Sequence, residues 1–218
     1  MGAKGARFGA YAALLLPMLA AAAPAATPRR LPPIEACGGD PSLRAFRAEL
    51  AAAVAGRSKE RLLALVADDI LVDFGGGSGR AAFVAAWKLD RPEASPLWAE
   101  LGAVLRLGCA REGDSYYAPA LFAQLGDEED VFELVVAVNP GSPMLAEPRP
   151  GSRIVKRLDW DVLTLADWDG SSAWVPVKLA DGRSGYVRRD QVRSPLDHRA
   201  LFRKVNGRWR ITAFVAGD

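Results

Sequence analysis

The stretch "VKLADGRSGYVRRDQVRSP", residues 177–195, decides how the second half of the chain is interpreted. Asp181 and Gly182 form a turn dipeptide between two runs that are rich in strand-forming residues. A second glycine, Gly185, stands just before Tyr186, where a strand is expected, and a glycine inside a strand marks a close approach of another backbone. The stretch therefore predicts a hairpin whose glycines serve chain geometry and not catalysis.

Short β-rich segments precede this hairpin at close spacing. They are "VFELVVAV" (131–138), "SRIVKRL" (152–158), "DVLTLADW" (161–168) and "AWVPVKL" (173–179), with the turn cluster "NPGSP" (139–143) after the first. Several short strands separated by turn signals are typical of a small barrel or sandwich. We therefore expect residues 131–195 to form a small β-barrel.

The region before the barrel has a helical pattern. Residues 27–41 are rich in proline and glycine and predict a tether. Ser42 and Ser58 are each followed by apolar residues at helical spacing and are expected to cap two helices, and residues 97–107 predict a further helix. Residues 42–130 are therefore predicted to form a mostly helical domain, so that the fold class is α+β.

The last segment, residues 196–218, predicts a β-hairpin. Asn206 and Gly207 are the strongest short hairpin signal, because both tolerate a positive φ. With these two as the turn, the cross-strand partners are Phe202 with Ile211, Lys204 with Trp209, Val205 with Arg208, and Arg203 with Arg210. Because like charges directly opposite one another repel, acidic side chains of the first domain are expected to compensate, and the hairpin is expected to bridge the domains.

Residues 1–26 have the pattern of a cleaved secretory signal. Lys4 and Arg7 precede an apolar run over residues 11–23, and small residues follow it. The run is shorter than the about 20 residues that a membrane span needs, so no transmembrane segment is expected in the mature chain. We predict a periplasmic or secreted protein.

The chain contains two cysteines, Cys37 and Cys109. In an oxidising compartment a lone pair of cysteines forms a disulfide more often than a metal site, which needs three or four ligands. Two unpaired buried thiols are the alternative. We predict the disulfide, and we expect no metal and no cofactor.

The charge is distributed unevenly along the chain. Without the signal, 26 basic residues balance 26 acidic ones, which argues against a dedicated nucleic-acid binder. Residues 27–148 carry a net charge of −6 and residues 149–218 carry +6. Either the two halves attract each other, or the second presents a basic face to an anionic partner in the cell envelope.

Aromatic side chains beside acidic ones are the candidate ligand contacts. Trp160 and Trp168 have aspartates next to them in the sequence, and exposed aromatics on small barrels bind peptides or glycans. With Tyr186 they form the predicted groove, and Arg188 and Arg189 form its rim.

The candidates for catalysis are weaker. Asp69 and Asp73 are at alternate positions of one expected strand and could point the same way. No histidine, lysine or further acid stands at a spacing typical of a catalytic site, so solvated acids are the simpler interpretation. The glycines of residues 75–79 are interpreted as a turn, and His198, the only histidine, has no ligand or nucleophile motif near it. We therefore predict no catalytic residues.

Residues 131–195 resemble a bacterial SH3-like domain, a small β-barrel common in exported envelope proteins. The likeness rests on Pro143, Leu145, Gly151, Ile154, Val155, Val162, Leu163, Trp174 and Val177, and on "DGRSGYV" with Gly182, Gly185, Tyr186 and Val187. The resemblance implies a non-catalytic module of a kind often associated with peptidoglycan or with a partner domain.

The flanks carry a weaker likeness. "ALVADDILVDFGGG" (64–77) and "NGRWRITAFV" (206–215) look like the beginning and end of a nuclear-transport-factor-like α+β cone. This resemblance implies that the barrel is an insertion and that the last hairpin returns to the first domain. It also implies small-molecule binding, or isomerase or cyclase chemistry with Asp69 or Asp73 as general base. The strands expected between these ends are not evident in the sequence.

Three hypotheses follow. The first is an exported, non-catalytic SH3-like protein that binds cell-wall material such as peptidoglycan, or an envelope protein. The alternative is the small-molecule-binding or enzymatic cone. In the third, the barrel only docks on its own first domain and buries Trp160 and Trp168 between the two.

Overall fold

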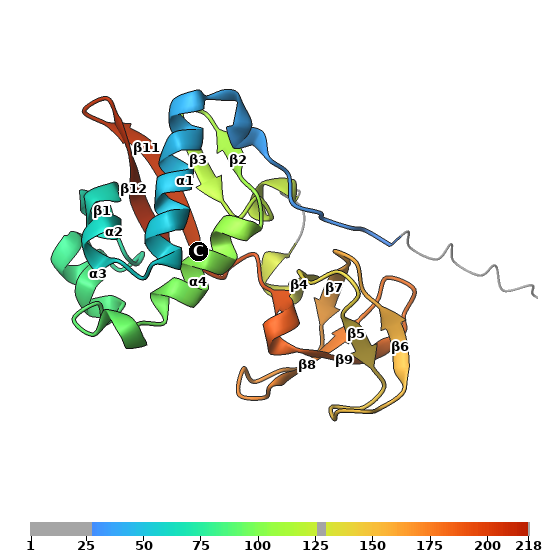
Figure 1. Ribbon diagram of the computed structural model, residues 1–218. Helices are drawn as coiled ribbons and strands as arrows, with labels where there is room; N and C mark the ends of the chain where they lie inside the picture. The colour runs from blue at the N-terminus through green and yellow to red at the C-terminus, as the bar shows by residue number, and fades with distance from the viewer. Residues whose placement is uncertain (1–27, 126–129, 218) are drawn as a thin grey trace, which may run out of the picture.

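The structure is a computed structural model that describes residues 28–125 and 130–217. The predicted signal segment, residues 1–26, lies outside the described residues. The fold is mixed α+β, as predicted, with four α-helices and two sheets (Figure 1). In the part of the chain that the structure describes, no helix has both the length and the apolar character to cross a membrane.

The first sheet has five strands in the order β1-β12-β11-β3-β2. The strands are β1 (Val66–Leu71), β2 (Ala110–Glu112), β3 (Ser115–Ala118), β11 (Arg199–Val205) and β12 (Arg208–Val215). The helices beside it are α1 (Pro41–Ala55), α2 (Lys59–Leu65), α3 (Arg80–Ala86) and α4 (Leu97–Arg106).

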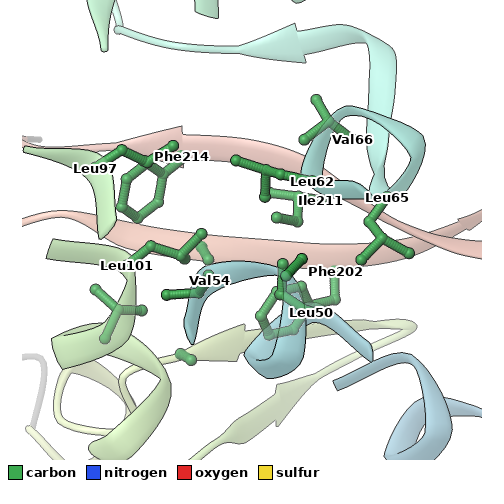
Figure 2. Packing of buried hydrophobic residues seen from close by; sticks show 14 of the residues in the cluster. Leu50, Val54, Leu62, Leu65, Val66, Leu97, Leu101, Phe202, Ile211 and Phe214 are labelled. Atoms are coloured by element: carbon green, nitrogen blue, oxygen red, sulfur yellow. The ribbon is translucent and has the colours of Figure 1, made fainter. Parts of the chain in front are cut away.

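The core of this unit lies between α1, α2, α4 and the central hairpin (Figure 2). Leu50 of α1, Leu62 of α2 and Leu101 of α4 are fully buried. They pack with Phe202 and Ile211, which are also fully buried. The space between helices and sheet is therefore filled by side chains.

The start of α1 differs from the prediction. Its cap is Asp40 and not Ser42, and one carboxylate oxygen accepts hydrogen bonds from the Ser42 amide at 2.8 Å and the Leu43 amide at 3.3 Å. Asp40 takes this role because Pro41 supplies the first helical position, where its missing N–H costs nothing. Ser58 caps α2 as expected.

The C-terminal hairpin has the predicted register. Phe202 pairs with Ile211, Lys204 with Trp209, Val205 with Arg208, and Arg203 with Arg210. β12 pairs in parallel with β1, and β11 pairs antiparallel with β3, so the hairpin forms the centre of the first sheet.

The expected acidic compensation of Arg203 and Arg210 is wrong for the described residues. Arg203 donates to the Ser115 hydroxyl at 2.7 Å, and Arg210 donates to the Trp209 carbonyl at 2.9 Å. Neither forms an ion pair with a described carboxylate. Both side chains are on the sheet face opposite Phe202 and Ile211, where Arg203 is exposed to solvent and Arg210 is partly buried, so solvent and not ion pairing screens their repulsion.

The second sheet has seven strands in the order β10-β4-β7-β8-β9-β5-β6, and it lies in the sequence between β3 and β11. Its strands are β4 (Leu134–Ala137), β5 (Pro143–Leu145), β6 (Ile154–Arg157), β7 (Val162–Leu165), β8 (Trp174–Lys178), β9 (Ser184–Arg188) and β10 (Val192–Arg193). Alternate residues such as Val175, Val177 and Val187 are buried in a core of its own.

The glycines of the opening stretch have the geometry that the sequence predicts. Gly182 has φ +88° in the turn between β8 and β9. Gly185 lies in β9, where a Cβ atom would be 2.6 Å from the Leu145 carbonyl oxygen and 2.8 Å from Cε of Met144. The first glycine supplies a left-handed turn, and the second allows β5 and β9 to approach.

We expect Gly185→Ala to lower the free energy of unfolding by about 2 kcal/mol, because the added methyl group overlaps backbone that cannot rotate away. Gly39→Ala is the control, since a Cβ there has no atom within 4 Å. Urea denaturation of both variants measures the difference, and equal stability would contradict this account of Gly185.

The predicted disulfide between Cys37 and Cys109 is confirmed. Both cysteines are fully buried. Backbone hydrogen bonds of 2.8 Å flank the disulfide, from Ala36 to the Cys109 carbonyl and from Cys109 to the Ile34 carbonyl. The predicted tether is thus fixed to the segment that follows α4.

Candidate functional site

The five predicted contact residues lie in different environments. Trp160 is partly buried and packs against Leu31, Leu107, Leu121 and Val136, which come from both units. It therefore lies where the helical unit meets the second sheet.

A short buried network holds the turn that presents Trp160. Asp161 is 1% exposed, and its carboxylate accepts from Nζ of Lys156 at 2.6 Å and from the Asp159 amide at 2.8 Å. The Trp160 carbonyl accepts from the Leu31 amide at 2.9 Å, and Trp160 itself has φ +59°. Contacts on both sides thus fix the indole against the tether.

A groove of about 380 Å³ opens beside Trp160, between α4 and the second sheet. The helical unit contributes Glu100, Ala103, Arg106 and Leu107, and the second sheet and its loops contribute Val138, Asn139, Trp160, Arg189, Asp190, Val192 and Arg193. We call this the interunit groove. It brings together two of the five predicted residues, Trp160 and Arg189.

A partly buried ion pair closes one side of the interunit groove. Arg193 of β10 donates to Oε1 of Glu100 in α4 at 2.7 Å and to the His198 carbonyl at 2.5 Å. Burial raises the pKa of Glu100, but hydrogen bonding from His198 and the charge and hydrogen bond of Arg193 outweigh it and lower the pKa to about 2. Glu100 is therefore ionised at neutral pH and neutralises Arg193 across the two units.

His198 lies beside this ion pair, with Nδ1 at 3.7 Å from Oε1 of Glu100. Its ring stacks on Phe214 with centroids 5.2 Å apart and contacts Trp87 edge to face at 4.7 Å.

The remaining cations of the interunit groove differ in their pairing. Arg189 forms an ion pair with Asp197 at 3.1 Å and lies 5.8 Å from the ring of Trp168. Arg106 is exposed at the end of α4 and forms no ion pair with any described residue. Arg106 is therefore the cation that is free to meet an anionic ligand.

The other predicted residues do not line this groove. Trp168 packs against the second core, and its buried indole Nε1 has no hydrogen-bond partner among the residues that the structure describes. Tyr186 is in β9, opposite Pro176 and Leu145. Arg188 is exposed and bound to Asp190 at 3.0 Å. The predicted grouping of both tryptophans with Tyr186 is thus not seen in the groove. Trp160 precedes β7 and Trp168 follows it, so the two lie beyond opposite ends of that strand.

The candidate catalytic acids are on the surface. Asp69 and Asp73 are both exposed, and Asp73 accepts a hydrogen bond from the Gly77 amide at 2.9 Å in the glycine turn. Neither carboxylate lines the interunit groove. Their simpler interpretation as solvated acids therefore agrees with their positions.

The metal-ligating groups give no free site. Among the described residues, the group of three possible ligands is Glu35, Cys37 and Cys109. Both cysteines of this group form the disulfide, so their sulfur atoms are not available as thiolate ligands.

Neither a protein-family model, nor a curated protein, nor a solved structure matches this chain.

Proposed function

We propose that this chain is an exported, non-catalytic protein that binds cell-wall material in the interunit groove, with an envelope protein as the other partner class. The observation that carries the proposal is the meeting of Trp160 with Arg106 and Arg189 in one groove. An indole supplies a flat apolar surface for a sugar or peptide, and a guanidinium binds the carboxylates that peptidoglycan carries.

The proposed identity of the second unit is an SH3-like barrel over residues 131–195. Its support is the likeness in sequence together with the positive φ at Gly182 and the close approach at Gly185. The proposed export agrees with the disulfide, since such bonds persist in oxidising compartments.

Part of the docking hypothesis is compatible with this proposal. Trp160 packs between the units, whereas Trp168 packs on the second core. The interface thus positions one face of Trp160, and the groove beside it leaves room for a ligand.

The second candidate function is small-molecule binding by an α+β cone with the barrel inserted. The observation in its favour is topological: the last hairpin joins β1 and β3, and the second sheet intervenes in the sequence. Its enzymatic form lacks support from Asp69 and Asp73, which are exposed.

Sedimentation with purified peptidoglycan tests the first proposal. We expect Arg106→Glu to reduce the bound fraction about tenfold, since it replaces attraction by repulsion at the anion. Arg153→Glu is the matched control, because Arg153 is an exposed arginine outside the groove.

The two tryptophans provide a second comparison in the same assay. Trp160→Ala is expected to weaken binding, and Trp168→Ala is expected to leave binding of the folded protein unchanged. Circular dichroism confirms folding of each variant. Equal binding by Arg106→Glu and Arg153→Glu, or loss of binding with Trp168→Ala alone, would contradict the proposal.

A further inference from the structure

A second hollow, of about 600 Å³, lies at the turn end of the C-terminal hairpin. It is lined by Asp40, Arg111, Asp114, Ser115, Tyr116, Arg203, Lys204 and Trp209, all from the helical unit and its sheet. We call it the hairpin pocket. It is separate from the interunit groove and shares no lining residue with it.

The floor of the hairpin pocket is aromatic. Lys204 and Trp209 pair across the hairpin on the same sheet face as Phe202 and Ile211, so this face continues past the filled core. The rings of Tyr116 and Trp209 meet edge to face with centroids 5.5 Å apart. Trp209 donates from Nε1 to the Ser42 hydroxyl at 2.9 Å, which fixes the indole against α1.

Cations surround this floor. The guanidinium carbon of Arg111 lies 5.6 Å from the Tyr116 ring centroid, and Nζ of Lys204 lies 5.0 Å from the Trp209 ring centroid. Arg203 belongs to the opposite sheet face and donates to the Ser115 hydroxyl, so it lines only the edge of the pocket. Each cation is thus positioned beside an aromatic ring or at the edge of the floor.

The acids of the pocket leave these cations largely unneutralised. Hydrogen bonding from Ser42 lowers the pKa of Asp40 to about 2, and Oδ1 of this carboxylate is engaged in capping α1. Only Oδ2 faces Lys204, at 3.5 Å. Among the described residues, Arg111 and Arg203 have no carboxylate partner, and exposed Asp114 forms no ion pair.

We propose that the hairpin pocket binds a small organic anion with a flat apolar part. The flat part lies against the partly exposed ring of Tyr116, which the buried Trp209 supports edge to face, and the anionic group is held by Arg111 and Lys204. Cations above aromatic rings at the edge of an apolar floor suit a ligand that is apolar at one end and negative at the other.

A pair of dyes tests both halves of this proposal. Anilinonaphthalenesulfonate has two aromatic ring systems and a sulfonate, and phenylnaphthylamine has the same ring systems without the anion. We expect the full mature protein to bind the sulfonate dye about tenfold more tightly than the neutral dye in fluorescence titrations, because only the sulfonate can pair with the cations.

Variants at three exposed positions test whether the dye binds in the hairpin pocket. Arg111→Gln and Lys204→Gln are each expected to weaken binding of the sulfonate dye about fivefold and to leave binding of the neutral dye unchanged. Asp114→Asn is expected to strengthen binding of the sulfonate dye and not of the neutral dye, since it removes a negative charge from the pocket. Arg153→Gln, outside the pocket, is the control and should change neither dye.

The neutral dye also controls for folding, because a loosened core would bind both dyes more strongly. The proposal is overturned if the sulfonate dye does not bind, if both dyes bind alike, or if the pocket variants behave like Arg153→Gln. None of these results would alter the proposal for the interunit groove, which depends on Arg106.

Discussion

Replacing both Cys37 and Cys109 by alanine is expected to lower the free energy of unfolding by about 4 kcal/mol. The two cysteines are 72 residues apart in the chain, so the disulfide removes a large part of the entropy of the unfolded state. The disulfide also fixes the tether, which supplies Leu31 to the packing around Trp160. The loss should therefore loosen the interface between the two units as well.

Urea denaturation with and without reductant measures this effect. The wild-type protein should become less stable when it is reduced, and the double variant should be insensitive to reductant. A double variant as stable as the oxidised wild type would contradict the expected role of the disulfide.

Arg193→Met is expected to lower the free energy of unfolding by about 3 kcal/mol, the low end for a buried pair, because it leaves the partly exposed Glu100 carboxylate with only His198 beside it. The Arg193 side chain is 7% exposed, and Glu100 belongs to the other unit. Glu100→Gln should cost at least as much as Arg193→Met, since it leaves the more deeply buried Arg193 guanidinium without its counter-charge. The double variant should recover part of the loss, which isolates the coupling between the two side chains.

The same pair gives a pH dependence with a defined sign. The pKa of Glu100 is about 2 in the folded protein against an ordinary value of 4.5. Its stabilisation is therefore fully present above about pH 4.5 and is lost as the pH falls toward 2. Wild type and Glu100→Gln should converge in stability over this range, whereas a constant difference down to pH 2 would show that the Glu100 carboxylate is not stabilised by His198 and Arg193.

Local signals in the sequence were sufficient to predict the hairpins. Asn206 and Gly207 fix a turn by backbone geometry alone, and the pairing of Arg203 with Arg210 follows from counting outward. The roles of Gly182 and Gly185 also follow from backbone geometry alone, since each meets a local requirement of the chain. The disulfide was predicted by elimination, because only two cysteines exist.

Features that depend on distant contacts could not be predicted. β2 and β3 have three and four residues, too few to show a strand period, and they form a sheet only because β11 pairs with β3. The sequence therefore left open whether the last hairpin belongs to the first unit.

The site was predicted only in part for a similar reason. Trp160 and Trp168 have the same kind of acidic neighbours, yet one packs at the interface and the other on the second core. Arg106 gave no signal beyond its place at the end of a helix. Helical spacing identifies Leu97 and Leu101 as the core face of α4, but it does not show that a second sheet lies beside the face with Glu100 and Arg106.

The most direct measurement of the proposed binding site is an NMR titration of the isotope-labelled mature protein with soluble peptidoglycan fragments, followed at the indole N–H resonances. The interunit groove predicts that the Trp160 resonance shifts with fragment concentration, while the resonances of Trp168 and Trp209 stay in place. A shift of Trp168 or Trp209 with Trp160 unchanged would contradict it.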